Sequence, residues 1–152
     1  MQKVLIRKIE ARDETAWRKL WAGYCTFYEI SLPAATTNHT WDRIMDATSS
    51  VHAIVAEDAS HGVIGICNYV LHENTWVTTP VCYLEDLFVE PTLRAGGIGA
   101  ALINWLKNEM ETKGWSRVYW NTKENNYRAR GLYDKFTPRD PFVRYTIKAG
   151  AK

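Results

Sequence analysis

The amino-acid sequence predicts a mixed α/β fold, because segments with the periodicity of strands alternate with segments with the periodicity of helices. The expected order is β-α-α-β-β-β-α-β-α-β, which is unlike a helix bundle or an all-β sandwich. The chain has 152 residues, of which 46% are hydrophobic and 24% charged, as in ordinary globular proteins. No repeat, linker or low-complexity tract interrupts it, so we expect a single domain over residues 1–152.

The N-terminal elements follow from periodicity and from residues that begin or interrupt helices. Alternating apolar and basic residues predict the first strand. An aspartate before an apolar helical face predicts a capped helix, and a proline-containing polar stretch after it predicts a loop. In order, we expect a strand over Val4–Lys8, a helix from Asp13 to about Tyr24, a loop over Ser31–Thr40, and a short helix marked by Trp41, Ile44 and Met45.

Three strands come next, and then helices and strands alternate to the C-terminus. A turn over Ala59–Gly62 suits a hairpin, Pro91 ends a strand because proline cannot donate to a ladder, and Gly114 suits a helix C-terminus. The expected strands are Val51–Glu57, Val63–His72, Val81–Val89, Val118–Thr122 and Phe142–Ile147. The expected helices are Gly99–Lys113 and one that runs from Asn125 or Asn126 through Lys135.

Composition excludes several classes of partner. The formal net charge is +2 and the basic residues are scattered, so we expect no nucleic-acid binding. No apolar run approaches the roughly 20 residues of a membrane span, and the N-terminal residues lack the pattern of a signal peptide. The three cysteines and four histidines have no disulfide or metal-ligand spacing, so we expect no metal. These observations favour a cytoplasmic protein.

The most informative stretch is Tyr83–Lys113, which reads as a strand, a proline stop, a glycine-rich loop and an amphipathic helix. The glycines allow a tight turn and a close approach by a ligand. Unpaired N–H groups at the start of the helix favour an anion, and Arg94 adds a cation. A diphosphate fits this arrangement, although a purely structural turn would show the same pattern. The stretch lacks the GxxxxGK[ST] and GxGxxG motifs of the common nucleotide-binding loops.

Two motifs in this part of the chain occur together in one superfamily. The first is P-x-x-R-x-x-G-x-G-A, formed by Pro91, Arg94, Gly97, Gly99 and Ala100. It resembles the coenzyme A pyrophosphate loop of the GNAT acetyltransferases. The second resembles that superfamily's closing motif N-x-x-A-x-x-L-Y, formed by Asn126, Ala129, Leu132 and Tyr133. The resemblance implies a mostly antiparallel central sheet flanked by helices on both faces, with acetyl-CoA as co-substrate and no metal.

A finer resemblance is to the histone, polyamine and amino-acid N-acetyltransferases of that superfamily. The run YLEDLFV is similar to a strand of the polyamine enzymes, and the resemblance is dense over Tyr83–Lys135 and thin before it. It implies acetyl transfer to a primary amine of a polyamine, an amino acid or a lysine side chain, by direct attack in a ternary complex. One departure is the Lys135–Pro138 segment, which replaces the family's usual Gly-Phe turn and leaves the acceptor-side wall open to question.

The resemblance also implies which residues bind the co-substrate. Main-chain groups of a strand would pair with pantetheine, and those of the glycine-rich loop would surround the diphosphate. The first group is Leu87, Phe88 and Val89, and the second is Arg94, Ala95, Gly96, Gly97, Ile98, Gly99 and Ala100. Asn126 would touch coenzyme A as well, although capping its helix is a sufficient explanation for this residue.

The resemblance further implies that two residues carry the proton transfers. Tyr133 is the candidate general acid, because a phenol of pKa near 10 can protonate a leaving thiolate. Glu85 is the candidate base, since an ammonium must lose a proton before it attacks. Asp86, Tyr28 and Glu29 are the further candidates for substrate contact. The alternatives are a packed tyrosine, a surface carboxylate at a strand bulge and an ordinary helix end.

Two other classes of function stay open on the sequence alone. One is a coenzyme A-binding module that has lost catalysis and regulates a partner. The other is an interaction protein with an aromatic surface. Seven tryptophans are many for one small core, so we expect a homodimer whichever function holds.

Overall fold

The computed structural model describes residues 3–150, apart from the side chain of Ala95, and its contacts divide the chain into two compact units. The first unit, Met1–Asn121, contains the sheet with helices α1 to α3. The second unit, Thr122–Lys152, contains helix α4 (Tyr127–Tyr133). Among the described residues, no helix combines the length and the apolar character that crossing a membrane requires.

The sheet of the first unit is mixed and mostly antiparallel, which confirms the predicted fold class. Its strand order is β1-β2-β3-β4-β5, and all neighbours pair antiparallel except β4 and β5, which are parallel. A two-residue parallel pair leaves β5 much shorter than the expected strand over Val118–Thr122. The strands are β1 (Val4–Lys8), β2 (Val51–Asp58), β3 (Gly62–His72), β4 (Val81–Val89) and β5 (Val118–Tyr119).

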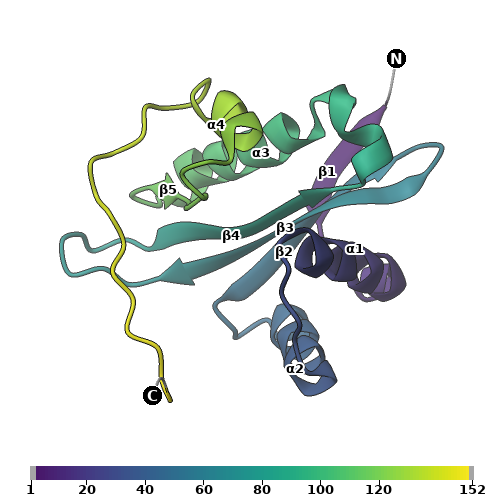
Figure 1. The fold of residues 1–152 in the computed structure, drawn as a ribbon, viewed down its shortest axis with the longest axis horizontal. Helices are drawn as coiled ribbons and strands as arrows, with labels where there is room; N and C mark the ends of the chain where they lie inside the picture. The colour runs from purple at the N-terminus through teal and green to yellow at the C-terminus, as the bar shows by residue number, and fades with distance from the viewer. Residues whose placement is uncertain (1–2, 151–152) are drawn as a thin grey trace. The chain divides into compact units, whose positions relative to one another are not determined.

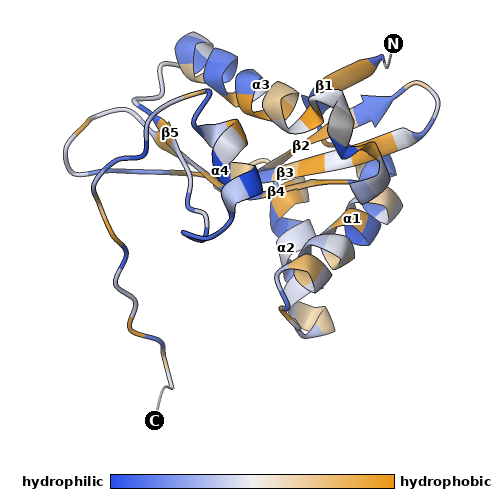
Figure 2. Ribbon diagram, turned by 45° about the horizontal axis from the view of Figure 1, so that its top comes forward, coloured by the Kyte–Doolittle hydropathy of each residue, from blue (hydrophilic) through white to orange (hydrophobic). Residues whose placement is uncertain are grey.

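Helices cover both faces of this sheet, as Figure 1 shows. Helices α1 (Glu14–Phe27) and α2 (Ala34–Met45) lie on one face, and α3 (Ile98–Lys113) lies on the other. Apolar residues dominate the central strands between these helices (Figure 2). One face of the sheet therefore packs against α1, and the other packs against α3.

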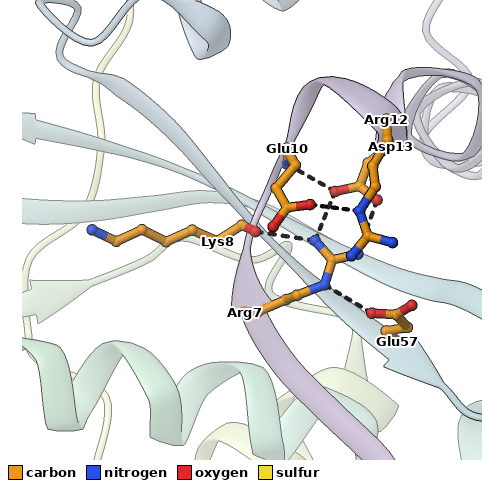
Figure 3. A network of polar contacts seen from close by, with 6 residues as sticks. All are labelled: Arg7, Lys8, Glu10, Arg12, Asp13 and Glu57. Carbon is orange, nitrogen blue, oxygen red and sulfur yellow. Dashed lines mark hydrogen bonds and ion pairs between the residues drawn. The ribbon is translucent and has the colours of Figure 1, made fainter.

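Helix α1 begins at a polar network that joins it to β1 and β2 (Figure 3). Arg7 donates to both carboxylate oxygens of Asp13 at 2.8 and 2.9 Å, and to Glu57 at 2.8 Å. Asp13 also accepts from the backbone N–H of Glu10 at 2.8 Å. Asp13 occupies the position before α1, as expected, but its side chain makes no cap hydrogen bond to that helix. The Asp13 carboxylate hydrogen-bonds to Arg7 instead. Helix α1 ends at Phe27 rather than near Tyr24.

The expected loop over Ser31–Thr40 is wrong, because α2 already begins at Ala34. Pro33 precedes the first helical residue, where its missing N–H costs nothing, and its carbonyl accepts from Thr36 at 2.9 Å. Tertiary contacts then overcome the weak helix propensity of the Thr36–Asn38 stretch. The indole of Trp21 donates to the Thr37 hydroxyl at 3.2 Å, and Trp41 is buried at 6% exposure.

The expected final strand over Phe142–Ile147 is also wrong, since this segment has no strand structure. Its residues alternate between apolar and polar types, but a strand needs a neighbour to complete its ladder, and this segment pairs with none of the described strands. Its large side chains are accordingly exposed. They are Phe142 at 77%, Val143 at 78%, Tyr145 at 93% and Ile147 at 101%.

Gly23 lets α1 lie close to β4, which generates a stability prediction. A Cβ at this position would lie 2.8 Å from Cε2 of Phe88, a ring that is only 6% exposed. We expect Gly23→Ala to lower the free energy of unfolding by about 1–2 kcal/mol, because overpacking outweighs the gain in helix propensity. Urea denaturation would measure the change.

Gly131→Ala is the matched control, because a Cβ on Gly131 in α4 meets no atom within 4 Å. This variant is expected to be neutral or more stable by up to about 1 kcal/mol. Equal stability of the two variants would contradict the close approach of α1 to Phe88.

Candidate functional site

The two candidate carboxylates on β4 lie at a β-bulge. Asp86 pairs with Asn68 on β3, and the next pair along the ladder is Tyr69 with Leu84, so Glu85 is the extra residue. Glu85 is exposed, whereas Asp86 is only 8% exposed. A bulge redirects side chains and interrupts pairing, and such bulges are frequent next to active sites. The bulge thus explains how two consecutive acidic residues fit into a central strand.

Buried hydrogen bonds hold the Asp86 carboxylate in place. Asn68 donates to Asp86 Oδ2 at 3.1 Å, and Asn68 Oδ1 in turn accepts from the Trp17 indole at 3.0 Å. Burial raises the pKa of Asp86 to about 6, while hydrogen bonds from Tyr24 and Asn68 oppose that rise. Asp86 therefore changes its charge near neutral pH, whereas an ordinary aspartate is ionised throughout this range.

A series of aromatic rings runs along α1 beside these carboxylates. Ring centroids lie 5.7 Å apart for Trp17 and Trp21, 5.1 Å for Trp21 and Tyr24, and 4.7 Å for Tyr24 and Tyr28. Burial and the charge of Asp86 raise the pKa values of both Tyr24 and Tyr28, so both phenols stay protonated at neutral pH. Half-buried rings next to carboxylates form a surface that suits an ammonium group.

Glu29, another candidate for substrate contact, lies just beyond the end of α1. Its φ angle of 55° places it in the left-handed region, which is uncommon for a residue other than glycine. Its N–H donates to the Thr26 carbonyl at 3.1 Å, and the side chain is exposed. The helix end thus holds Tyr28 and Glu29 in a defined turn.

Strands β4 and β5 separate after two paired positions. Only Cys82 with Val118 and Tyr83 with Tyr119 are paired, while β4 continues for six residues to Val89. The predicted pantetheine-binding residues Leu87, Phe88 and Val89 all lie on this part of β4 beyond the separation. The described strands thus offer no neighbour for the β5 side of that segment, and an extended ligand could pair with it.

A second polar and aromatic group lies where β4 and β5 separate. The rings of Tyr83 and Tyr119 stack at 5.0 Å, and His72 Nε2 lies 2.7 Å from the Tyr119 hydroxyl. His72 Nδ1 lies 2.7 Å from the Glu73 carbonyl, so the Nδ1 position carries the proton. Glu85 lies on β4 between Tyr83, which stacks on Tyr119, and Asp86, which accepts a hydrogen bond from Tyr24, so along the strand it stands between these two aromatic groups.

The predicted diphosphate loop lies at the junction of a 3₁₀ helix, η2 (Pro91–Gly96), with α3. Gly97 connects them with a φ of 72°, a conformation that favours glycine, and the Gly97 carbonyl accepts from Ala101 at 3.1 Å. Ile98 is buried beneath the loop, while Gly99 and Ala100 lie in the first turn of α3. This helix has 16 residues, so its N-terminal amides can bind an anion.

Arg94 in η2 contacts β4 and α1. Its Nε donates to the Val89 carbonyl at 3.0 Å. The guanidinium carbon lies 5.3 Å from the ring centroid of Phe27 and 5.1 Å from that of Phe88. These distances are within the range of cation–π contacts.

The closing motif lies in the second unit, where Asn126 and Tyr133 stand at opposite ends of α4. Asn126 precedes the helix, and its side-chain oxygen accepts from the Ala129 N–H at 3.3 Å, as a helix cap does. Tyr133 is the last helical residue and is half-buried. The helix ends there rather than at Lys135.

Some residues of the site were not identified from the sequence. Tyr24 and Phe27 belong to an aromatic run with Trp21 and Tyr28, but neither Tyr24 nor Phe27 was assigned a role from the sequence, and Asn68 was not singled out. A polar residue in a buried strand needs a partner, so Asn68 carried a usable signal. No group of three or more His, Cys, Asp or Glu side chains in the described part of the chain could hold a metal ion.

Comparisons with known proteins agree with this geometry. Residues 15–137 match the family model described as "Acetyltransferase (GNAT) family". The chain is 33% identical over 144 residues to the "D-amino-acid N-acetyltransferase HPA3" of Saccharomyces cerevisiae, which covers 94% of this chain and 89% of the relative. It is 31% identical over 100 residues to the "Thialysine N-epsilon-acetyltransferase" of Bos taurus, an alignment that covers 61% of this chain and 58% of the relative.

Solved structures share the fold at low identity. A ribosomal-protein-alanine N-acetyltransferase from Brucella melitensis biovar Abortus 2308 superposes with a TM-score of 0.79 at 19% identity, over 96% of this chain and 99% of the other. The AAC(6')-Iy structure, in complex with a bisubstrate analog of CoA, has a TM-score of 0.79 at 20% identity, over 97% and 99%. Together with the family match, these likenesses show that the chain belongs to the GNAT family of acetyl-CoA-dependent N-acetyltransferases.

Proposed function

We propose that this chain transfers an acetyl group from acetyl-CoA to the primary amine of a small molecule, with amino-acid-like amines as the first candidates. The acidic bulge on β4, between the rings of α1 and those where β5 separates, carries the proposal. An ammonium group suits carboxylates and aromatic faces. The two relatives, a D-amino-acid N-acetyltransferase and a thialysine N-epsilon-acetyltransferase, support an amino-acid-like amine. A polyamine or a lysine side chain is an alternative acceptor.

The residues of the first unit fit acetyl-CoA. The unpaired part of β4 can hydrogen-bond to pantetheine through Leu87, Phe88 and Val89, and the Arg94–Ala100 loop can surround the diphosphate with amides. A β4 N–H near the thioester would stabilise the oxyanion that develops during attack, an effect typically worth about 2.7–4 kcal/mol per donor.

The proposed reaction is one direct transfer in a ternary complex. Glu85, directly or through a water, accepts the proton of the ammonium, and the free amine attacks the thioester carbonyl carbon. The C–N bond forms as the C–S bond breaks, and Tyr133 donates its proton to the leaving thiolate. The second proton of the attacking nitrogen is released to solvent as the amide forms, and the Tyr133 phenolate takes up a proton from solvent. Asp86 and Tyr28 hold the acceptor. Once Asp86 is ionised, its negative charge favours the positively charged ammonium form of the acceptor.

A thiol-release assay tests the function directly. The full chain is incubated with acetyl-CoA and a panel of D- and L-amino acids, spermidine and lysine-containing peptides. We expect release of coenzyme A with at least one small amine. Tyr133→Phe should lower kcat by about 10²-fold or more while acetyl-CoA binding by calorimetry changes little.

The control for this assay is Tyr127→Phe on the same helix, a 74% exposed residue whose loss should leave turnover unchanged. Binding of coenzyme A without thiol release on any amine would favour a regulatory binding module instead. Release with peptides alone would move the acceptor to protein lysines.

The raised pKa of Asp86 gives a stability prediction with a definite sign. The folded state holds the proton more tightly than the unfolded chain, whose aspartate has a pKa near 3.9. The free energy of unfolding should therefore fall as the pH rises from about 4 to about 6, by on the order of 2–3 kcal/mol from this group. Asp86→Asn should abolish this loss.

Urea denaturation of wild type and Asp86→Asn between pH 4 and pH 7.5 measures the effect. Asp42→Asn, at an exposed position on α2, is the control and should keep the pH dependence of the wild type. Parallel curves for wild type and Asp86→Asn would show that the carboxyl does not take up its proton on folding.

The exposed C-terminal segment supports the expected homodimer. Four large apolar side chains between Phe142 and Ile147 are at least 77% exposed, and three of them, Val143, Tyr145 and Ile147, alternate with polar residues in the pattern of a strand. We propose that a second copy of the chain covers this segment. Light scattering of the wild type should give a dimer.

Tyr145→Lys combined with Ile147→Lys places charges on one side of this segment and should shift the protein to a monomer at micromolar concentration. Thr146→Lys, on the other side, is the control and should stay dimeric. A monomeric wild type, or a dimeric double variant, would contradict the role of the segment.

A further inference from the structure

The Arg94 side chain connects two parts of the site that the proposed function treats as separate. One is the glycine-rich loop, in which Arg94 lies, and the other is the end of α1, which carries Tyr28 and Glu29. Between them, the guanidinium of Arg94 lies against the rings of Phe27 and Phe88. We refer to Arg94, Phe27 and Phe88 as the arginine clamp.

The β4 side of the clamp is fixed. The Phe88 ring lies against the backbone of α1 at Gly23, where even one additional carbon atom would be 2.8 Å from it. Arg94 Nε donates to the carbonyl of Val89, the residue after Phe88, at 3.0 Å. The start of the loop is also held, because the Glu90 N–H donates to the Ile64 carbonyl at 2.8 Å.

On the α1 side of the clamp, Phe27 contacts Tyr28, which the proposed function places at the acceptor. The rings of Phe27 and Tyr28 meet edge to face at 5.0 Å, and the Tyr28 ring packs against Tyr24 at a tilt, with centroids 4.7 Å apart. The turn that follows places Glu29 at its positive φ and closes with a 2.8 Å hydrogen bond from Ile30 to Cys25. A shift of the Phe27 ring would therefore move Tyr28 with it.

We propose that Arg94 is a positioning residue that couples the two binding sites through the arginine clamp. A diphosphate that orders the loop fixes Arg94, and Arg94 fixes Phe27 and the Tyr28–Glu29 turn. Acetyl-CoA binding then favours acceptor binding, and by linkage the acceptor favours acetyl-CoA binding to the same degree. The inference rests on the proposed function for the identity of the two ligands.

Phe27→Ala tests the clamp, because Phe27 lies on α1 and outside the diphosphate loop. The loss of one cation–π contact should weaken coenzyme A binding about fivefold by calorimetry. The KM of the acceptor should also cease to depend on the acetyl-CoA concentration, while kcat at saturation changes less than about twofold. Phe27→Tyr keeps the ring and should restore wild-type values.

Trp76→Ala is the control, the loss of a larger aromatic ring at an 81% exposed position in the β3–β4 connection, and should leave all three quantities unchanged. Phe27 is 53% exposed, so we expect its variants to fold, which thermal melts would confirm. If the wild type binds coenzyme A and Phe27→Ala binds it within twofold as tightly, the clamp is wrong and the proposed function stands. If Phe27→Tyr behaves like Phe27→Ala, the clamp is likewise wrong. A wild type that fails to bind coenzyme A overturns both.

Discussion

The hydrogen bonds from Trp17 through Asn68 to Asp86 are the constraint on which the proposed acceptor site of this protein depends. Trp17 is fully buried and belongs to α1, Asn68 to β3 and Asp86 to β4. Each buried polar group satisfies the next, so the helix, the central strand and the acidic strand must keep one register. An apolar residue at Asn68 would leave the indole N–H without its partner and would remove one of the hydrogen bonds to the carboxylate.

The β-bulge on β4 works together with this register. It lets Asp86 face α1 inside the protein while Glu85 remains accessible at the surface. Two adjacent carboxyl groups thereby acquire different environments: burial raises the pKa of Asp86, and Glu85 stays in solvent. Pairs of titratable groups with different environments are typical of sites that hold and transfer protons.

Local patterns in the sequence predicted much of the fold. The strands from Val51 to Val89 and the glycine loop before α3 were identified because alternation, Pro91 and the glycines are local signals. Helix α2 was missed over its first turns because contacts to Trp21 and Arg18, and not intrinsic propensity, stabilise it. The expected final strand failed because alternation predicts a strand only where a neighbour can pair with it.

The site was predictable as single residues but not as an arrangement. Glu85 and Asp86 stood out because two charges in a strand are unusual, and a bulge was already one interpretation of them. The partners of Asp86 and the position of Arg94 against Phe27 depend on contacts between residues far apart in the sequence, about which local patterns carry no information.

The close contact of Gly23 with Phe88 has a consequence for how related enzymes could acquire new substrates. Because the Phe88 ring fills the space beneath Gly23, the distance between the α1 backbone and the sheet is fixed. Replacing Tyr24 or Tyr28 would then change the proposed acceptor surface without displacing the helix. Selectivity could therefore change through exchange of half-buried rings on a helix that keeps its position, while the residues proposed to bind acetyl-CoA stay the same.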